Sequence, residues 1–313
     1  GEQLMKIIVV SQSCLSLPLI QQLQAKGQLA GVWLHNVRAE DSQQLGWFCQ
    51  QQNIPLLVID PAQPQALLEH FDTVAADCAI SAFLSYLFPS QITEKLQGRL
   101  MNIHASALPQ LRGADPLYWL LRQGANETQL SLHQVADKVD EGDLLFQQAL
   151  LINPFDTHQS LSNTVATELP VLIDAWIGAG GLDVTAWAQE GESSSAPKVQ
   201  ISERQIDWSS MSSLDIFNFV RACASAGQGA WFRFGQEYLQ LLECTPVQGD
   251  NLQLEPGIIV HLGAPKGILL ASTDGLLRLD VISSSGGIFS GLRFAERYRL
   301  QAGQKFERCQ AIQ

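Results

Sequence analysis

No apolar run in this sequence reaches the roughly 18 residues that a membrane-spanning helix needs. No basic segment, apolar segment and cleavage site follow one another near its start, so we find no secretory signal. Apolar residues nevertheless make up 46% of the 313 residues, which is too many for a disordered chain. The sequence therefore predicts a globular, cytoplasmic protein with room for two compact domains.

The cysteine and glycine patterns of common metal and nucleotide sites are also missing. No CxxC pair occurs among the six cysteines, which are Cys14, Cys49, Cys78, Cys223, Cys244 and Cys309. We therefore expect free thiols, no disulfide framework and no bound metal. Ser11, Gln12 and Ser13 follow the first strand-like run, where a dinucleotide-binding fold would carry GxGxxG, so we expect no nicotinamide.

Positive charge is scarce and unevenly distributed. Residues 1–202 contain 9 Lys and Arg against 20 Asp and Glu, a net charge of −11, whereas residues 203–313 contain 10 against 11. An acidic main region disfavours a nucleic-acid partner, because such binding depends on cations that neutralise phosphates. One basic cluster stands out, and it is either a solvated face or a contact for a phosphate-bearing partner: Arg293, Arg297, Arg299, Lys305 and Arg308.

Strand-like runs alternate with helical periodicity over the first two thirds of the chain. The runs are Lys6–Val10, Leu29–Leu34, Leu56–Ile59, Thr73–Leu84, Leu100–Ile103, Leu130–Val135 and Leu144–Ile152. Helical spacing of apolar residues marks Leu15–Gln24, Ser42–Gln52 and Thr157–Trp176. This alternation predicts an α/β domain with a mostly parallel sheet over residues 5–189.

The last third of the chain has a different pattern. Glu190–Pro197 is rich in Gly, Ser and Pro, and residues 190–203 are predicted to form a linker. A predicted helix over Leu214–Cys223 is followed by short strand-like runs with frequent turn signals: Trp231–Phe234, Tyr238–Glu243, Gly257–His261, Gly267–Ser272 and Leu276–Ile282. This pattern predicts a small β-barrel domain over residues 204–313.

Polar residues that suit acyl transfer to an amine follow the run that starts at Leu100. Asn102 and His104 lie two residues apart, so on an extended backbone their side chains point to the same side. An amide and a protonated imidazole can stabilise an oxyanion, and the carboxylate of Asp140 can hold the imidazole or relay a proton. Taken alone, the same residues also fit a capping Asn, a hydrogen-bonded His and an ordinary turn. His133, on an apolar strand, is interpreted as packed or hydrogen-bonded rather than catalytic.

Two ordered motifs distinguish between these interpretations. Met101–Pro109, together with Arg112 and Gly113, resembles the NIHxSxLPxxRG signature of the folate-dependent formyltransferases. The stretch 139–143 resembles the second signature of that family, which commonly reads LDTGD, and the separation of the two motifs is similar to the family's. Two ordered motifs at family spacing are a much stronger signal than either motif alone.

The resemblance implies a Rossmann-like domain in which Asn102, His104 and Asp140 are the catalytic residues. It implies 10-formyltetrahydrofolate as the co-substrate. Further landmarks at Ala196–Lys198 and Ile206–Trp208 are similar to those that precede the C-terminal, OB-like β-barrel of methionyl-tRNA formyltransferases.

The resemblance also implies where the folate binds. Phe83, Leu84 and Ser85 occupy the place of a segment that lines the folate pocket, and Ser85 stands where the family usually has Gly. Val139 and Glu141, on either side of the catalytic carboxylate, are expected to contribute to the same pocket.

Charge guides the choice of acceptor. Methionyl-tRNA formyltransferases carry a basic insertion after the second strand, whereas residues 36–44 here are short and acidic with one Arg. This difference favours a specialised biosynthetic acceptor over tRNA. Such an acceptor is an amino group on a carrier protein, a small amine or an amino sugar, and the chain is either free-standing or a domain of a peptide or polyketide synthetase. The alternatives are a methionyl-tRNA formyltransferase, a 10-formyltetrahydrofolate hydrolase and a non-catalytic folate-binding module.

Overall fold

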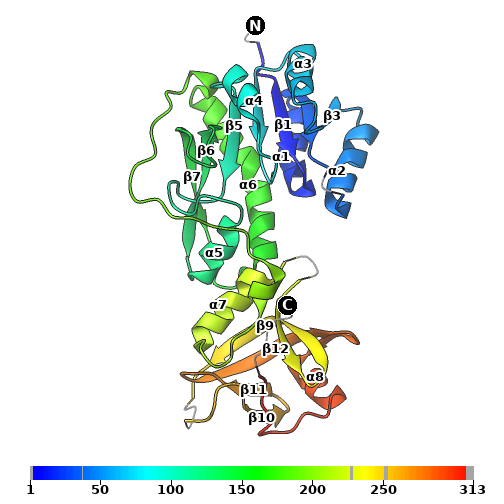
Figure 1. The fold of residues 1–313 in the computed structure, drawn as a ribbon, viewed down its shortest axis with the longest axis vertical. Helices are drawn as coiled ribbons and strands as arrows, with labels where there is room; N and C mark the ends of the chain where they lie inside the picture. The colour runs from blue at the N-terminus through cyan, green and yellow to red at the C-terminus, as the bar shows by residue number, and fades with distance from the viewer. Residues whose placement is uncertain (1–2, 37, 226–227, 250–252, 308–313) are drawn as a thin grey trace. The chain divides into compact units, whose positions relative to one another are not determined.

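The computed structural model describes residues 3–36, 38–225, 228–249 and 253–307, and Arg308 and Cys309 lie outside them. The chain divides into two compact units (Figure 1). The first contains residues 1–116, 127–151 and 162–197, and the second contains residues 117–126, 152–161 and 198–313.

A seven-stranded sheet in the order β3-β2-β1-β4-β5-β6-β7 forms the centre of the first unit. Its strands are β1 (Ile7–Ser11), β2 (Leu29–Leu34), β3 (Leu56–Val58), β4 (Cys78–Ser81), β5 (Leu100–His104), β6 (Glu127–Gln134) and β7 (Leu144–Leu151). Strands β1 to β5 are parallel, and β6 and β7 are antiparallel to their neighbours. The mostly parallel, Rossmann-like sheet predicted from the sequence is confirmed.

Helices separate many of these strands along the chain, and others precede or follow the strands of the second unit. They are α1 (Leu17–Ala25), α2 (Glu40–Gln51), α3 (Gln65–Thr73), α4 (Ser90–Lys95), α5 (Pro116–Arg122), α6 (His158–Gly178), α7 (Ser213–Cys223) and α8 (Gly291–Arg297). Short 3-10 turns occur at Cys14–Ser16, Gly181–Asp183 and Ile201–Arg204.

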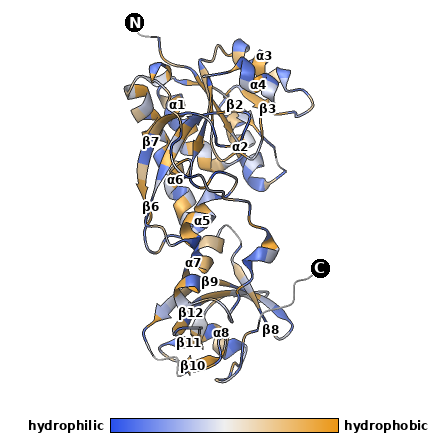
Figure 2. Ribbon diagram, turned by 60° about the vertical axis from the view of Figure 1, so that its left-hand side comes forward, coloured by the Kyte–Doolittle hydropathy of each residue, from blue (hydrophilic) through white to orange (hydrophobic). Residues whose placement is uncertain are grey.

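The core of the first unit follows from its strand composition. Every residue of β1 is buried, as expected for a parallel strand covered on both faces. Leu67 and Phe71 of α3 and Ile92 of α4 pack with Ile8 and Val10 of β1 in one apolar cluster. Figure 2 shows hydrophobic residues concentrated in the strands of this sheet.

The predicted strand over Thr73–Leu84 is wrong in its extent. Only Cys78–Ser81 forms a strand, because only these residues pair with β1 and β5. Thr73 instead ends α3, and Phe83 has a positive φ of 51°, which is incompatible with an extended strand. The continuous apolar run reflects burial rather than one regular element.

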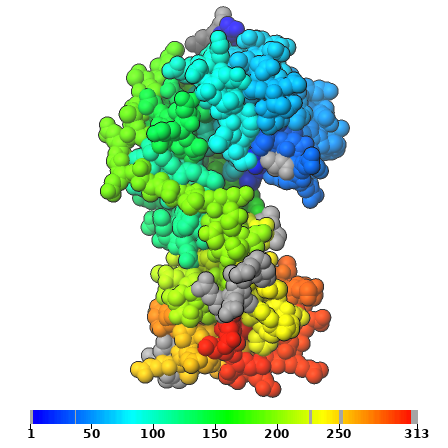
Figure 3. Space-filling model, viewed as in Figure 1, coloured from blue at the N-terminus to red at the C-terminus, as the bar shows by residue number. Residues whose placement is uncertain are grey.

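The Gly-, Ser- and Pro-rich region is tied to the first unit over part of its length. We call residues 184–197 the strap; it is drawn yellow-green and has no helix or regular strand (Figure 1), and much of it lies on the surface (Figure 3). Trp187 forms an isolated bridge with Leu144 of β7. The Ser194 amide donates to the Pro109 carbonyl at 3.2 Å, and the Ala196 amide donates to the Arg112 carbonyl at 2.7 Å. These bonds join the strap to the segment that follows β5.

The second unit contains an antiparallel sheet in the order β10-β11-β12-β9-β8, with β13 paired to β12. Its strands are β8 (Ala230–Phe234), β9 (Glu237–Val247), β10 (Ile259–Gly263), β11 (Gly267–Ala271), β12 (Leu276–Ser284) and β13 (Gly287–Ser290). Bridges join Arg233 to Glu307 and Ile258 to Lys305, so residues 305–307 reach both edges of the sheet. This closure is the arrangement expected of a small barrel.

The described members of the basic cluster are partly neutralised. Arg293 pairs with Glu296 at 2.8 Å, and Lys305 pairs with Glu255 at 3.1 Å. The guanidinium of Arg297 lies 5.6 Å from the centre of the Phe289 ring. These contacts favour a solvated face over a phosphate-binding surface. Within the described ranges, no helix is both long and apolar enough to cross a membrane.

Candidate active site

The candidate site begins where two parallel strands end side by side. Ser81, the last residue of β4, is the register partner of Asn102 on β5. The Ser81 hydroxyl donates to Asn102 Oδ1 at 2.7 Å and so fixes the orientation of the carboxamide. His104 is the last residue of β5. Carboxyl ends of strands in open α/β sheets are where such folds bind ligands.

The antiparallel neighbour β6 adds a second histidine. Asn102 is the cross-strand partner of His133, and Asn102 Nδ2 lies 3.2 Å from His133 Nε2. His133 Nδ1 lies 2.9 Å from the Gln134 carbonyl, which can only accept, so Nδ1 carries a proton. Nε2 faces both the Asn102 amide and the Asp140 carboxylate, and a single ring nitrogen can either accept from the first or donate to the second. Cross-strand neighbours on one face of a sheet are close enough for such contacts.

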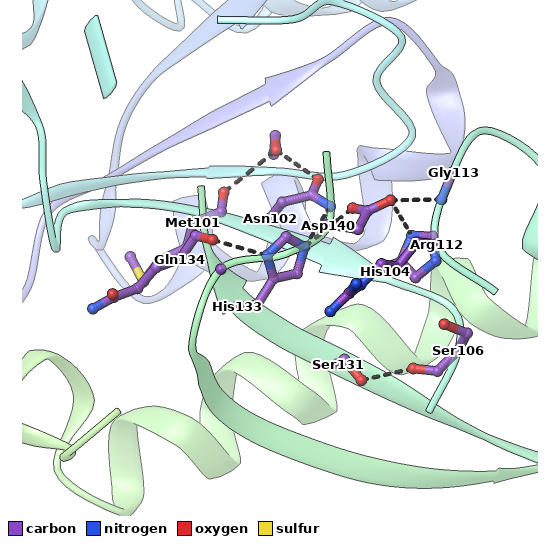
Figure 4. Close-up of polar contacts among 12 residues, drawn as sticks. Met101, Asn102, His104, Ser106, Arg112, Gly113, Ser131, His133, Gln134 and Asp140 are labelled. Atoms are coloured by element: carbon purple, nitrogen blue, oxygen red, sulfur yellow. Dashed lines mark hydrogen bonds and ion pairs between the residues drawn. The ribbon is translucent and has the colours of Figure 1, made fainter. Parts of the chain in front are cut away.

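Asp140 lies at the centre of the cluster, with the His133 ring on one side of its carboxylate and the His104 ring on the other (Figure 4). Oδ1 is 3.3 Å from His133 Nε2, and Oδ2 is 3.4 Å from His104 Nδ1. The Gly113 amide donates to Oδ2 at 2.9 Å. Burial raises the pKa of Asp140, but the His133 hydrogen bond, the two imidazoles and the Gly113 amide outweigh it, so the pKa lies below its ordinary value. The carboxylate is the favoured form.

His104 is buried, with 6% of its surface exposed, and both of its ring nitrogens face acceptors. Nε2 donates to the Leu111 carbonyl at 2.7 Å, and Nδ1 faces Asp140. Burial lowers the pKa of His104, and Asp140 and the Leu111 carbonyl only partly oppose it. The sequence suggested a protonated imidazole, whereas burial here favours the neutral ring with its proton on Nε2.

Two glycines allow the loops of the site to approach one another. A Cβ on Gly142 would lie 1.7 Å from the Gln134 carbonyl oxygen, and a Cβ on Gly113 would lie 2.9 Å from the Ala196 carbonyl oxygen. Gly113 also has a φ of +121°. A larger residue at either position would displace the backbone. Both glycines are therefore needed for the loops that carry Asp140 and its amide donor to approach their neighbours this closely.

The expected folate-binding residues lie outside this polar cluster. Within the described parts of the chain, no hydrogen bond or ion pair joins them to Asn102, His104 or Asp140. The amide and hydroxyl of Ser85 both donate to Gln12 Oε1, at 2.7 and 2.8 Å. Glu141 Oε1 lies 3.7 Å from Arg112 Nη1, and Val139 exposes 48% of its surface.

The structure brings the three predicted catalytic residues together and adds His133, which sequence reasoning set aside as a packed or hydrogen-bonded residue. The only signal in the sequence was the alternation of Ser131 and His133 on one strand, which places both side chains on the same face. The register that sets His133 opposite Asn102 is a property of the sheet. Across the described residues, no group of three His, Cys, Asp or Glu side chains could hold a metal ion.

This arrangement suits proton transfer in a polar, water-poor setting. A buried carboxylate next to a neutral imidazole can take up one proton, which the pair then shares between Oδ2 and Nδ1. The Asn102 amide has two N–H groups, of which one is directed to His133, so the second can donate to a reacting oxygen.

The chain is similar in sequence and in fold to several known proteins. A methionyl-tRNA formyltransferase of Coprothermobacter proteolyticus is 28% identical over 289 residues, covering 89% of this chain and 91% of that protein. The fold resembles an N-formyltransferase from Helicobacter canadensis solved with folinic acid and dTDP-3-aminofucose, with a TM-score of 0.61, 17% identity and coverage of 88% and 99%. It also resembles HypX from Aquifex aeolicus in complex with tetrahydrofolic acid, with a TM-score of 0.60, 16% identity and coverage of 98% and 51%.

Two family models cover most of the chain. The model described as formyl transferase matches residues 5–175, which is more than half of the sequence. The model described as formyl transferase, C-terminal domain, matches residues 198–299. The chain therefore belongs to the formyl transferase family and is an enzyme of that family.

Proposed function

We propose that this enzyme transfers the formyl group of 10-formyltetrahydrofolate to a small or carrier-tethered amine in a specialised biosynthetic pathway. The observation that carries the proposal is the buried Asp140 carboxylate, which contacts His104, His133 and the Gly113 amide beside Asn102. We assign the catalytic roles to Asn102, His104 and Asp140.

In the proposed reaction the amine nitrogen bonds to the formyl carbon, and the carbonyl electron pair moves to the formyl oxygen. The second N–H of Asn102 donates to that oxyanion. The Asp140–His104 pair accepts the proton that the amine loses, because neutral His104 leaves Nδ1 able to take a share of it. When the oxyanion collapses, the bond from carbon to N10 of the folate breaks, and N10 takes up the proton. The products are the formamide and tetrahydrofolate, so no covalent enzyme intermediate is needed.

The residues beside the cluster fit a flat, partly apolar ring such as a pterin. Val139 exposes 48% of its surface although the next residue, Asp140, is buried. Phe83 and Leu84 are half-buried, and they follow β4 closely. We propose that these three residues, with Ser85 and Glu141, line the folate pocket. Two proteins of similar fold, HypX and the Helicobacter enzyme, were solved with tetrahydrofolic acid and folinic acid, which supports a folate as the ligand.

The choice of acceptor rests on charge. Helix α2 begins at Glu40, directly after a short connection from β2, and Asp41 Oδ1 accepts from the Cys14 amide at 2.9 Å. Glu40 and Asp41 therefore belong to the folded first unit. Residues 36–44 do not contain the basic insertion expected of a methionyl-tRNA formyltransferase. In the second unit, Arg293 and Lys305 are paired with glutamates. Both observations support an acceptor that does not depend on a large cationic surface.

Methionyl-tRNA is the second candidate acceptor. It is favoured by the 28% identity to a methionyl-tRNA formyltransferase over 89% of the chain. The discriminating experiment supplies 10-formyltetrahydrofolate with methionyl-tRNA, an aminoacyl carrier protein or an amino-sugar nucleotide, and follows release of tetrahydrofolate. If methionyl-tRNA is the only one of these acceptors that gives release, the proposed acceptor class is refuted. Release without any amine would indicate a hydrolase, and no release at all would indicate a folate-binding module.

A further inference from the structure

We propose that Gln189, far from the signature motifs in the sequence, is a positioning residue that holds the Asp140 loop in its reactive geometry together with Arg112. This inference rests on the proposed function and deepens it. Gln189 lies in the strap, at the end of the predicted α/β domain (residues 5–189) and directly before the predicted linker.

The amide nitrogen of Gln189 is committed to the catalytic loop. Nε2 donates to the Asp140 carbonyl at 2.7 Å and to the Gly142 carbonyl at 2.8 Å. Both of its hydrogens are used, and they bind the residue that carries the carboxylate and the residue two positions after it. Asp140 has a φ of +56°, a region that non-glycine residues rarely occupy. Such a conformation persists only where surrounding contacts determine it, and the two bonds from Gln189 are contacts of that kind.

The amide oxygen of Gln189 is committed to Arg112. It accepts from Arg112 Nη2 at 2.7 Å and from Nε at 3.2 Å. Because a guanidinium can only donate and a backbone carbonyl can only accept, just one orientation of the carboxamide satisfies all four bonds. The charge of Arg112 also polarises the carboxamide and strengthens its N–H groups as donors.

We call the hydrogen-bonded pair of Gln189 and Arg112 the clamp, and the neighbours of Arg112 link it to His104. The preceding residue, Leu111, accepts the hydrogen bond from His104 Nε2, and the following residue, Gly113, donates to the Asp140 carboxylate. The clamp formed by Gln189 and Arg112 therefore connects the backbone of the Asp140 loop to the segment that orients His104. We infer that it fixes the 3.4 Å separation of His104 Nδ1 and Asp140 Oδ2.

The decisive variant is Gln189→Met, which keeps the length of the side chain and adds no charge but removes all four bonds. Gln148→Met is the matched control. Gln148 is also half-buried, lies on β7 and donates to Glu168 at 2.7 Å, with no bond to the site. Both variants are compared with the wild type in two measurements on the full chain, one of which needs no acceptor.

The first measurement follows the titration of the His104 ring by NMR. His104 faces Asp140, which lies in the β6–β7 loop, and His133, which lies on β6. Asp140 raises the pKa of His104 against the larger, opposite effect of burial. If Gln189→Met releases Asp140, the pKa of His104 should fall by about half a unit or more, while Gln148→Met leaves it unchanged. Identical titrations in the wild type and Gln189→Met would overturn the inference, whether or not the proposed reaction occurs.

The second measurement is single-turnover formyl transfer at saturating folate with whichever acceptor the wild type uses. We expect Gln189→Met to be about 10- to 100-fold slower, because small displacements of reacting groups are costly. If that variant fails to fold, Gln189→Glu replaces it, since a carboxylate keeps the pairing with Arg112 but cannot donate to the two carbonyls. Transfer by Gln189→Glu at the wild-type rate would contradict the positioning role. An inactive wild type would instead refute the proposed function and leave the NMR test valid.

Discussion

Replacing His133 by Phe tests whether the second histidine is part of the site. Phe has a similar shape but makes no hydrogen bonds, so the change removes the contacts of His133 Nε2 with Asn102 Nδ2 and Asp140 Oδ1. His133 exposes only 2% of its surface, and the Gln134 carbonyl and the partner of Nε2 would each lose a bond. An orphaned buried polar group costs about 1–3 kcal/mol, so two of them should lower the free energy of unfolding by about 2–6 kcal/mol.

The same variant should also slow the reaction. Without His133, the pKa of Asp140 should rise, because the hydrogen bond from His133 is a main cause that lowers it. Asn102 would also lose the contact that orients its donor groups. We expect a loss of formyl transfer on the order of 10²-fold, comparable to the removal of one oxyanion donor. Urea unfolding and single-turnover kinetics measure the two effects separately.

Two further variants make this test specific. His133→Gln can restore one of the two contacts and should be less impaired than His133→Phe in both measurements. His261→Phe changes an exposed histidine of the second unit and should affect neither. If His133→Phe unfolds at the urea concentration of the wild type and retains its rate within about twofold, His133 is a packed core residue, and the reasoning from the cluster is wrong.

Further predictions concern the same site. His104→Ala and Asp140→Asn should each slow single-turnover transfer on the order of 10²–10³-fold, while calorimetric titration still detects tetrahydrofolate binding. The double variant should be little slower than either single one, and additive losses would contradict a shared role. The transfer rate should fall in acid with an apparent pKa below the ordinary value of about 6.5 for histidine, because the pKa of His104 is lowered. Stability should fall in the same direction below pH ~6.5, since the unfolded chain binds this proton more readily, and this loss should be smaller in His104→Ala, which keeps only the contributions of His35 and His70. Gly142→Ala should abolish transfer, because the new Cβ would lie 1.7 Å from the Gln134 carbonyl oxygen; normal activity would show that the loop can move aside.

The parts of the site that the sequence could predict are those encoded by local spacing. Asn102 and His104 lie two residues apart on one strand, so their common orientation follows from the period of a β-strand. Asp140 could be connected to them only through the resemblance of its motif to a family, because nothing in composition or periodicity sets the distance between separate loops. The structure does place the three side chains together.

The parts that the sequence could not predict depend on pairing between distant segments. His133 reaches the site because β6 runs antiparallel to β5 with His133 opposite Asn102, and a register shift of one residue would turn His133 to the other face. The apolar run 73–84 looked like one strand because burial alone does not distinguish a strand from the turn and loop that flank it. Residues 190–197 of the strap looked like a linker because they are rich in Gly, Ser and Pro, although the backbone of this part bonds to the segment after β5.

These two classes of residue have different physical tasks. In the proposed reaction the signature residues supply the reacting groups. Two residues of the signature segments have unfavourable backbone conformations, since Asp140 and Leu111 have φ values of +56° and +54°. A backbone of this kind costs about 1–3 kcal/mol per residue unless neighbouring contacts hold it. The compensating bonds come from Gln189 at Asp140 and from the Ser194 hydroxyl at Leu111, and the sequence context of neither residue carries a mark of catalysis. Motif comparison therefore points to the groups that we propose react, whereas the groups that we propose keep them in place become visible only once the hydrogen bonds of the loops are traced.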